Sequence, residues 1–328
     1  MQLVQTTSLT TRNARQDEPP AWLDRRLYPY ASHFFATPEG RMHYVDEGEG
    51  RPILFVHGTP SWSFEWRHAL SRLRQHARVI AVDHLGFGLS DKPQAAGYTP
   101  QDHARRLLAF VRALDLHELT LVVHDFGGPI GLPVALEDRE RVRCLVVLNS
   151  WAWPHAADPR IRRLSRIVAS PLGRLLYLGL NASPRWLIPA SFARREALTR
   201  SVHRHYLGPF ARRSERTAPW VLGVELAGSD AYYATLWERR AELRHVPSSL
   251  VWGERDPAFG PSYLERWREM LPNARVHALP VGHFPQEEAP DAVLEALRAA
   301  YNTPLQDNAA PLASGTSATV LRGPVGQS

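Results

Sequence analysis

Residues 119 to 131 read Leu119-Thr-Leu-Val-Val-His-Asp-Phe-Gly-Gly-Pro-Ile-Gly131. An apolar run rich in β-branched residues breaks at His124 and Asp125, and the apolar residues from Ile130 onward can form a helix. This pattern predicts a buried strand, a tight turn with Asp125 at its tip, and a helix. Strand, turn and helix in this order are typical of a nucleophile elbow, in which the attacking residue sits on the turn.

The residues around the turn are small, as an elbow requires. Gly127 and Gly128 follow the tip, where strand and helix approach closely, whereas Val123 occupies the earlier position at which glycine is usual. An alternative stays open on this stretch alone. The same pattern fits an ordinary strand–loop–helix of a nucleotide-binding sheet, with Asp125 as the cap of the helix.

Strands and helices alternate on both sides of this stretch. Apolar runs predict further strands at 41–46, 52–56, 79–83, 142–148, 248–253 and 274–279. Periodic segments predict helices at 61–73, 99–114, 261–271 and 289–301. The turn Glu47–Gly50 predicts that the first two of these strands form a hairpin that opens the sheet. The alternation as a whole predicts an α/β fold with a mostly parallel, doubly wound sheet.

The pattern changes between residues 152 and 246, where no β-branched run of strand length occurs. Helical segments are expected at 161–167, 172–180, 193–207 and 232–243, separated by Pro184, Pro189, Pro209 and Pro219. We interpret this segment as a helical cap inserted into a core of residues 21–151 and 247–303. Residues 1–20 and 304–328 lack periodicity and are expected to be disordered tails.

The positive charge of the chain is concentrated in the predicted cap. Residues 152–246 contain 16 arginines and 7 acidic residues, a net charge of +9, against +6 for the whole chain. The arginines stand at helical spacings beside leucines and without nucleic-acid motifs, so we interpret them as a solvated helix face and expect no nucleic-acid partner. This field can still attract anionic ligands.

Other features point to a cytoplasmic protein with no membrane partner. No apolar run approaches the ~20 residues of a membrane span, and residues 1–20 have no apolar centre such as a secretory signal needs. Cys144 is the single cysteine and lies in an apolar run, so no disulfide forms within the chain and a reducing compartment fits. The choice between a monomer and a homodimer stays open.

Three groups with complementary chemistry follow predicted strands, in the order Asp125, Asp256 and His283. A nucleophile, an acid and a base in this chain order are the arrangement of a hydrolytic triad on an α/β sheet. Each has a simpler interpretation, since Asp256 before Pro257 can initiate a turn and a Gly-His pair is common in loops. Their joint occurrence favours the triad. The histidines show no metal-ligand spacing, so neither a metal nor another cofactor is expected.

The motifs that carry these residues resemble those of haloalkane dehalogenases, from about Trp22 to Tyr301 outside the cap. The similar segments are His57-Gly-Thr-Pro-Ser-Trp-Ser-Phe64, Asp83-His-Leu-Gly-Phe-Gly-Leu-Ser-Asp-Lys-Pro93, Val123-His-Asp-Phe-Gly-Gly128, Trp252-Gly-Glu-Arg-Asp-Pro-Ala-Phe259 and Gly282-His-Phe-Pro-Gln-Glu287. The resemblance implies an α/β-hydrolase fold with Asp125 as nucleophile, His283 as base and Asp256 as its orienting acid. It also implies an oxyanion hole formed by the amides of Thr59 and Phe126.

Two positions depart from this family. Haloalkane dehalogenases usually carry Trp directly after the nucleophile and often Asn after the His-Gly, and both side chains donate to the leaving halide. This chain has Phe126 and Thr59 there. A phenyl ring has no N–H to donate, and threonine offers a hydroxyl in place of an amide. Triad chemistry is therefore better supported than halide as the leaving group.

The leading expectation is hydrolysis of a small apolar haloalkane by water through an alkyl-enzyme ester. Epoxide hydrolysis shares the first step but needs an acid, normally a cap tyrosine; the candidates are Tyr177, Tyr206, Tyr232 and Tyr233. Opening of a β-lactone would also explain the altered halide donors. A ligand-binding protein that keeps the fold without catalysis is the alternative of another class.

Overall fold

The computed structural model describes residues 20–155 and 157–302. The two predicted tails therefore fall almost wholly outside the described residues. Within these ranges one mixed sheet of eight strands forms the centre of the molecule, in the order β1-β2-β4-β3-β5-β6-β7-β8. The strands are β1 (His33–Thr37), β2 (Gly40–Glu47), β3 (Pro52–Val56), β4 (Arg78–Val82), β5 (Leu119–Asp125), β6 (Val142–Ser150), β7 (Ser248–Gly253) and β8 (Arg275–Leu279).

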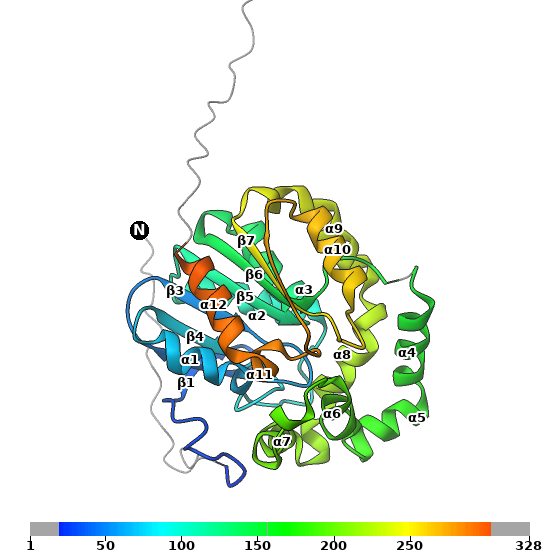
Figure 1. Cartoon of the computed structure of the whole chain (residues 1–328). Coiled ribbons are helices and arrows are strands. Elements are labelled where there is room, and N and C mark those ends of the chain that lie inside the picture. The colour runs from blue at the N-terminus through cyan, green and yellow to red at the C-terminus, as the bar shows by residue number, and fades with distance from the viewer. Residues whose placement is uncertain (1–19, 156, 303–328) are drawn as a thin grey trace, which may run out of the picture.

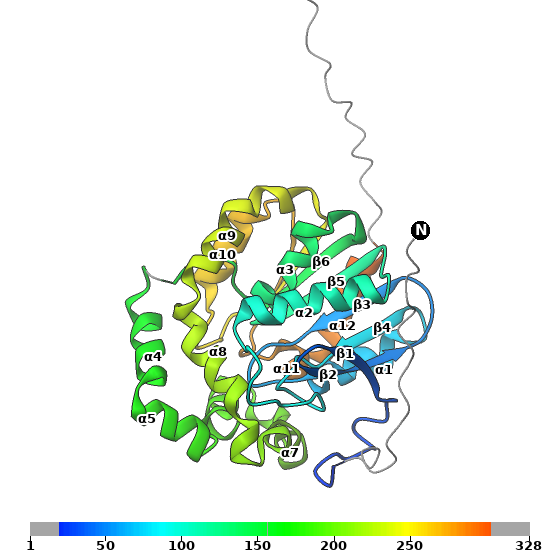
Figure 2. The same ribbon diagram turned by 180° about the vertical axis from the view of Figure 1, so that it is seen from behind.

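Helices cover both faces of this sheet, which confirms the predicted doubly wound α/β architecture (Figures 1 and 2). The core helices are α1 (Arg67–Leu73), α2 (Pro100–Ala113), α3 (Gly127–Glu137), α10 (Pro261–Met270), α11 (Pro285–Glu288) and α12 (Pro290–Tyr301). Alternate residues of β5 point to opposite faces, so Leu121 and Val123 pack with α2, α3 and α10, and Val122 packs with α1 and α12. β5 thus lies between two hydrophobic cores that fix its position, and all seven of its residues are buried.

The predicted opening hairpin is wrong. β2 pairs antiparallel with β1, which the sequence did not predict, and with β4, whereas β3 lies on the other side of β4 and pairs parallel with β4 and β5. The loop after β2 turns at Gly48 (φ +77°), where a side chain would collide with the carbonyl oxygens of Arg74 and Ala77. The loop is thus packed against the chain that enters β4, and β4 fills the place between β2 and β3.

The described part of the segment between β6 and β7 contains helices joined by loops and no strand, and it forms the expected cap beside the sheet (Figure 1). Its α-helices are α4 (Pro159–Ala169), α5 (Pro171–Arg174), α6 (Ile188–Ser191), α7 (Arg200–Leu207), α8 (Thr217–Gly228) and α9 (Asp230–Glu238). We did not predict α8, because we interpreted Pro219 as a break. Pro219 lies in the first turn of α8, where a missing amide costs no hydrogen bond. No helix in the described residues is long and apolar enough to cross a membrane.

Candidate active site

Asp125 lies at the end of β5, on a turn that few residues can form. Its φ of +52° is in the left-handed region, which costs a non-glycine residue of order 1–3 kcal/mol. The turn is held on both sides, since a side chain at Gly127 would collide with the carbonyl of Val56 in β3. The structure also explains Val123. A Cβ at position 131 would lie 2.7 Å from Val123 Cγ1, so Gly131 in α3 provides the space that a glycine at 123 usually gives.

Both oxygens of the Asp125 carboxylate face functional groups. Oδ1 accepts a hydrogen bond of 2.7 Å from the backbone amide of Thr59, and the amide of Phe126 also bonds to the carboxylate. Oδ2 lies 3.6 Å from Nε2 of His283. The side chain is 8% exposed, so the loops after β3 and β8 enclose it almost completely.

His283 is held between an acid and the cap. Its Nδ1 lies 2.7 Å from Oδ2 of Asp256, and its backbone amide donates to the carbonyl of Ser191 in α6 at 2.9 Å. Asp256 follows β7 and accepts from the amide of Ala258 (2.7 Å) and from Nδ2 of Asn149 (2.8 Å). The structure therefore brings Asp125, Asp256 and His283 into contact from the ends of three strands. Thr59 and Phe126 lie beside them, with their amides on Asp125.

The pKa values of these groups follow from burial and from their neighbours. Burial raises the pKa of Asp125, although His283 and His124 and the two amides oppose that rise. Burial opposes ionisation of Asp256 as well, but His283, Ala258 and Asn149 outweigh it and lower its pKa. The pKa of His283 is raised to about 9, because the charge of Asp256, its hydrogen bond and the charge of Asp125 outweigh desolvation.

A buried histidine lies behind the triad and contacts a carboxylate group. His124, which precedes Asp125, donates from Nε2 to the backbone carbonyl of His283 at 2.8 Å, while its Nδ1 lies 3.2 Å from Oε2 of Glu65. The same Glu65 oxygen accepts a 2.5 Å hydrogen bond from Ser61. Nδ1 of His124 also lies 3.2 Å from Nε2 of Gln286, so a carboxylate and a side-chain amide both face this nitrogen. The hydrogen bond from His124 thereby holds the backbone of His283 in place.

Two buried donors at the elbow have no hydrogen-bond partner among the described residues: Nε1 of Trp151 and Oγ1 of Thr59. Trp151 follows β6, and its ring packs edge-to-face on Phe126, with ring centres 4.7 Å apart. It also contacts Phe259, which in turn packs on His283. A buried donor left unpaired costs about 1–3 kcal/mol. An unpaired indole N–H thus lies on a ring that packs against Phe126, the residue at the position where the family usually carries Trp.

No group of three or more His, Cys, Asp or Glu side chains in the described ranges could hold a metal ion. The residues of the site offer a carboxylate, an imidazole with an acid behind it, two backbone amides and two donors without a partner among the described residues.

Known proteins resemble this chain in sequence and in fold. Residues 51–290 match the family model of the alpha/beta hydrolase fold. Haloalkane dehalogenase 2 of Mycobacterium tuberculosis is 38% identical over 276 residues, which cover 84% of this chain and 96% of the relative. The chain belongs to the haloalkane dehalogenase-like family of α/β-hydrolases.

Other members of the family extend the comparison. The cis-3-alkyl-4-alkyloxetan-2-one decarboxylase of Shewanella oneidensis is 35% identical over 281 residues, covering 82% of this chain and 87% of the relative. The crystal structure of the haloalkane dehalogenase DatA from Agrobacterium tumefaciens C58 matches with a TM-score of 0.74 and 28% identity, covering 83% of this chain and 96% of that one. The protein is accordingly an enzyme of the hydrolase type, and its α/β-hydrolase fold with a cap is confirmed.

Sequence reasoning passed over three residues that the structure places around the triad. We assigned no role to Asn149, yet its amide holds Asp256. His124 lies inside a quoted motif and Glu65 directly follows one, and neither was given a role. The residue types were visible in the sequence, but nothing in the spacing shows that strands β6 and β7 bring Asn149 beside Asp256, or that Glu65 reaches His124.

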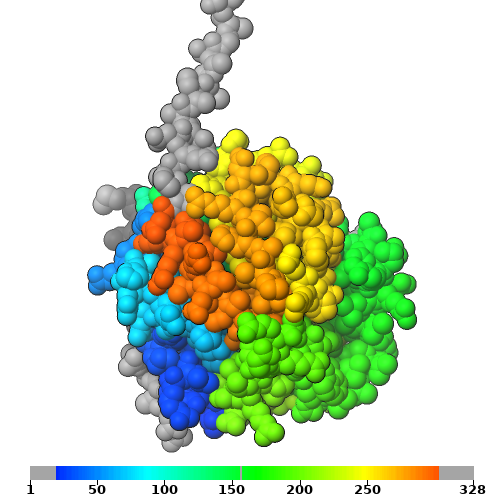
Figure 3. Space-filling model, viewed as in Figure 1, coloured from blue at the N-terminus to red at the C-terminus, as the bar shows by residue number. Residues whose placement is uncertain are grey.

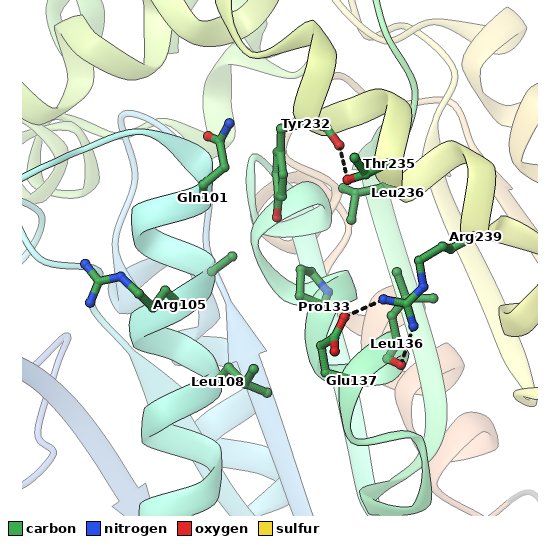
Figure 4. Close-up of a pocket in the computed structure, with 11 residues that line it drawn as sticks. Gln101, Arg105, Leu108, Pro133, Leu136, Glu137, Tyr232, Thr235, Leu236 and Arg239 are labelled. Carbon is green, nitrogen blue, oxygen red and sulfur yellow. Dashed lines mark hydrogen bonds and ion pairs between the residues drawn. The ribbon is translucent and has the colours of Figure 1, made fainter.

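A groove elsewhere on this hydrolase is separate from the site. It lies between α2, α3 and α9, where Tyr232 and Leu236 of α9 face Leu108 of α2 (Figure 4). None of the five predicted site residues lines it. The hydroxyl of Tyr232 donates to the carbonyl of Pro129 at 2.7 Å, so this tyrosine ties α9 to the start of α3.

Proposed function

We propose that the protein hydrolyses carbon–halogen bonds of small haloalkanes through a covalent ester on Asp125. One observation carries this proposal: Oδ1 of Asp125 is held by the amide of Thr59, while Oδ2 faces Nε2 of His283 at 3.6 Å. One oxygen is left to attack a saturated carbon, and the base stands beside the ester that would form. The haloalkane dehalogenase relatives support the same reaction class.

In the first half-reaction Oδ2 of Asp125 forms a bond to the carbon that carries the halogen. An ionised carboxylate needs to lose no proton before it attacks. The carbon–halogen bond breaks, and the halide leaves with the bonding electron pair. Trp151 Nε1 and Thr59 Oγ1, which are buried and unpaired in the described structure, are the donors proposed to hold that halide.

In the second half-reaction His283 takes a proton from water, and the resulting hydroxide attacks the carbonyl carbon of the ester. The negative charge then develops on Oδ1, where the amides of Thr59 and Phe126 stabilise it. Collapse of this intermediate releases the alcohol and restores the carboxylate, and the proton passes from His283 to solvent. Asp256 keeps the imidazole oriented and stabilises its cation. The reaction consumes the haloalkane and one water and yields alcohol, halide and a proton.

Epoxide hydrolysis is less well supported by the cap. The hydroxyl of Tyr206 donates to Glu287, that of Tyr232 to the Pro129 carbonyl and that of Tyr233 to the Glu225 carbonyl. The fourth candidate tyrosine of the described cap is Tyr177, whose hydroxyl is hydrogen-bonded to Ser183 and whose pKa is raised to about 12 by burial. Opening of an alkyl-substituted oxetanone is the second candidate, because the Shewanella relative is named for that substrate.

The covalent intermediate gives the decisive test. His283→Phe removes the base that acts in the second half-reaction alone, so the variant should react once with a primary bromoalkane and stop. We expect one equivalent of bromide per protein and a mass increase equal to the alkyl group, mapped to the peptide that contains Asp125.

Asp125→Ala is the matched control and should release no bromide. Continued turnover by His283→Phe without an adduct would refute the ester mechanism. A third outcome is possible, in which neither the parent protein nor His283→Phe releases halide and the parent protein forms carbon dioxide from an oxetanone. In that case the second candidate replaces the first.

A further inference from the structure

The exposed apolar side chains of this protein are concentrated in one segment of the cap. Among the described residues, nine large hydrophobic side chains are exposed, and seven of them lie between residues 164 and 187. These seven are Leu164, Ile167, Leu172, Leu175, Leu180, Trp186 and Leu187; the other two are Phe34 and Val276. Single exposed apolar residues are ordinary on a protein surface, but a cluster of this kind marks a contact with another phase or molecule.

This segment forms an outer edge of the molecule. We call residues 159–187 the cap rim; it comprises α4, α5 and the two π-helical turns Leu175–Gly179 and Ser183–Leu187. α4 buries Ile161 and Val168 on the side that packs against α8, so Leu164 and Ile167 point away from the protein. In both ribbon views α4 and α5 lie farthest from the sheet, and Figure 3 shows their green atoms at the right-hand edge.

The charges of the cap rim decide what can cover it. The 29 residues of the rim include six arginines, at positions 160, 162, 163, 166, 174 and 185, and no acidic residue. A second copy packed rim to rim would bring these like charges together while their solvent is removed, which opposes association. The leucines and arginines of the cap rim alternate, so a partner that complements them must offer negative charge at its surface and an apolar layer below that surface.

We propose that the cap rim binds the surface of an anionic phospholipid bilayer. Leu172, Leu175 and Trp186 would enter the boundary between headgroups and acyl chains, and the arginines would contact the phosphates. The rim would lie on the bilayer without crossing it, which revises our expectation of no membrane partner. The proposal is independent of the leaving group, although apolar substrates of the proposed kind partition into such a bilayer.

The test is co-sedimentation of the whole protein with vesicles. The probes are vesicles of phosphatidylcholine mixed with phosphatidylglycerol, and vesicles of phosphatidylcholine alone. We expect binding to the anionic vesicles at low salt, weaker binding at high salt, and a partition coefficient at least ~10-fold lower for Leu172→Gln/Leu175→Gln. Phe34→Gln/Val276→Gln alters the two exposed apolar residues outside the rim and should bind like the parent protein.

A second pair of variants separates charge from apolar contact. Arg163→Gln/Arg166→Gln should lose the preference for anionic vesicles while halide release from a water-soluble substrate is unchanged. Three outcomes would overturn the proposal: no binding of the parent protein to anionic vesicles, equal loss in the Phe34 and Val276 control, or a dimer in light scattering that Leu172→Gln/Leu175→Gln dissociates. The last outcome would identify the rim as an interface between copies.

Discussion

At the scale of single residues, the charge of Asp125 contributes to the pKa of His283, the base in the proposed mechanism. The pKa of His283 is raised to about 9, partly by Asp125, whose Oδ2 lies 3.6 Å from Nε2. In the proposed ester this carboxylate is neutral, so one cause of the rise disappears when His283 must accept a proton. The nucleophile thereby holds the imidazole protonated at rest and releases it once alkylated.

Asp125→Asn imitates the neutral ester and tests this coupling. Loss of a carboxylate this close changes a pKa by about one to three units. We therefore expect the pKa of His283, followed by NMR of isotope-labelled histidine, to fall by about that amount from its value near 9 in the parent protein. An unchanged titration would mean that Asp256 alone sets the protonation of His283.

Trp151 is the residue on which the choice of leaving group depends. Trp151→Phe keeps the aromatic packing on Phe126 and removes the unpaired N–H. If that N–H holds the halide, bromide release should slow ~10-fold, or about 1.4 kcal/mol, and quenching by free bromide should weaken in parallel. Trp66→Phe is the matched control, since Trp66 is also buried with Nε1 unpaired among the described residues, but it packs on Phe55. Equal effects of the two variants would remove Trp151 from the halide site.

At the scale of elements, the elbow depends on a pair of residues in β5 and α3. Gly131→Ala gains about 1 kcal/mol of helix propensity but places Cβ 2.7 Å from Val123 Cγ1, and such overpacking typically costs about 1–3 kcal/mol. We expect Gly131→Ala to lower the free energy of unfolding in the parent protein and to raise it in a Val123→Ala background. Urea unfolding of the four proteins measures both steps. An effect of the same sign in both backgrounds would contradict the pairing.

The elements that the sequence predicted well are those with unambiguous local signals. The capping residue Thr99 begins α2 through a reciprocal hydrogen bond with Asp102, and the apolar run at Ser248–Gly253 forms β7 with the predicted bounds. The order of β2, β4 and β3 could not be predicted, because a short glycine turn fits a hairpin equally well and the competing partner strand lies 30 residues further along the chain.

At the scale of the whole molecule, three buried histidines couple folding to pH. Burial lowers the pKa of His57 and, more strongly, those of His84 and His103, and nearby Arg106 adds to the effect on the latter two. The unfolded chain binds protons at these groups near pH 6.5, while the folded protein resists them. Stability from the three is therefore complete above pH 6.5 and is lost as the pH falls below it. His283, whose pKa is raised to about 9, stays protonated in the folded protein while the unfolded chain still takes up part of a proton there, so it opposes this loss by only about 0.3 kcal/mol.

We expect His57, His84 and His103 together to lower the free energy of unfolding by about 2–3 kcal/mol between pH 6.5 and 5.5, at up to about 1 kcal/mol per histidine. The lowered pKa values of His68, His155 and His205 add to this fall. Urea unfolding at the two pH values measures the fall, and His103→Leu should reduce it by up to about 1 kcal/mol. A pH-independent stability over this interval would show that the buried histidines titrate alike in the folded and unfolded chain.

The residues of the site, like the elements of the fold, fall into a group that the sequence could predict and a group that it could not. Asp125, Asp256, His283 and the amides of Thr59 and Phe126 follow from motifs at strand ends, because parallel strands deliver their carboxyl ends to one edge of the sheet. Their roles in catalysis stay predictions until the adduct is measured. Asn149 and Glu65 contact the triad region through side chains from distant segments, and sequence periodicity does not reveal such contacts.

The two ends of the cap lie side by side. The chain leaves the sheet after Ser150 of β6 and returns at Ser248 of β7, and these strands are hydrogen-bonded neighbours, with Leu148 opposite Val251. An insertion between adjacent strands can be exchanged, lengthened or shortened while the register of the sheet stays the same. A chimaera that carries another relative's cap would keep the nucleophile and its acid and base, so substrate range can evolve by grafting while the chemistry is inherited unchanged.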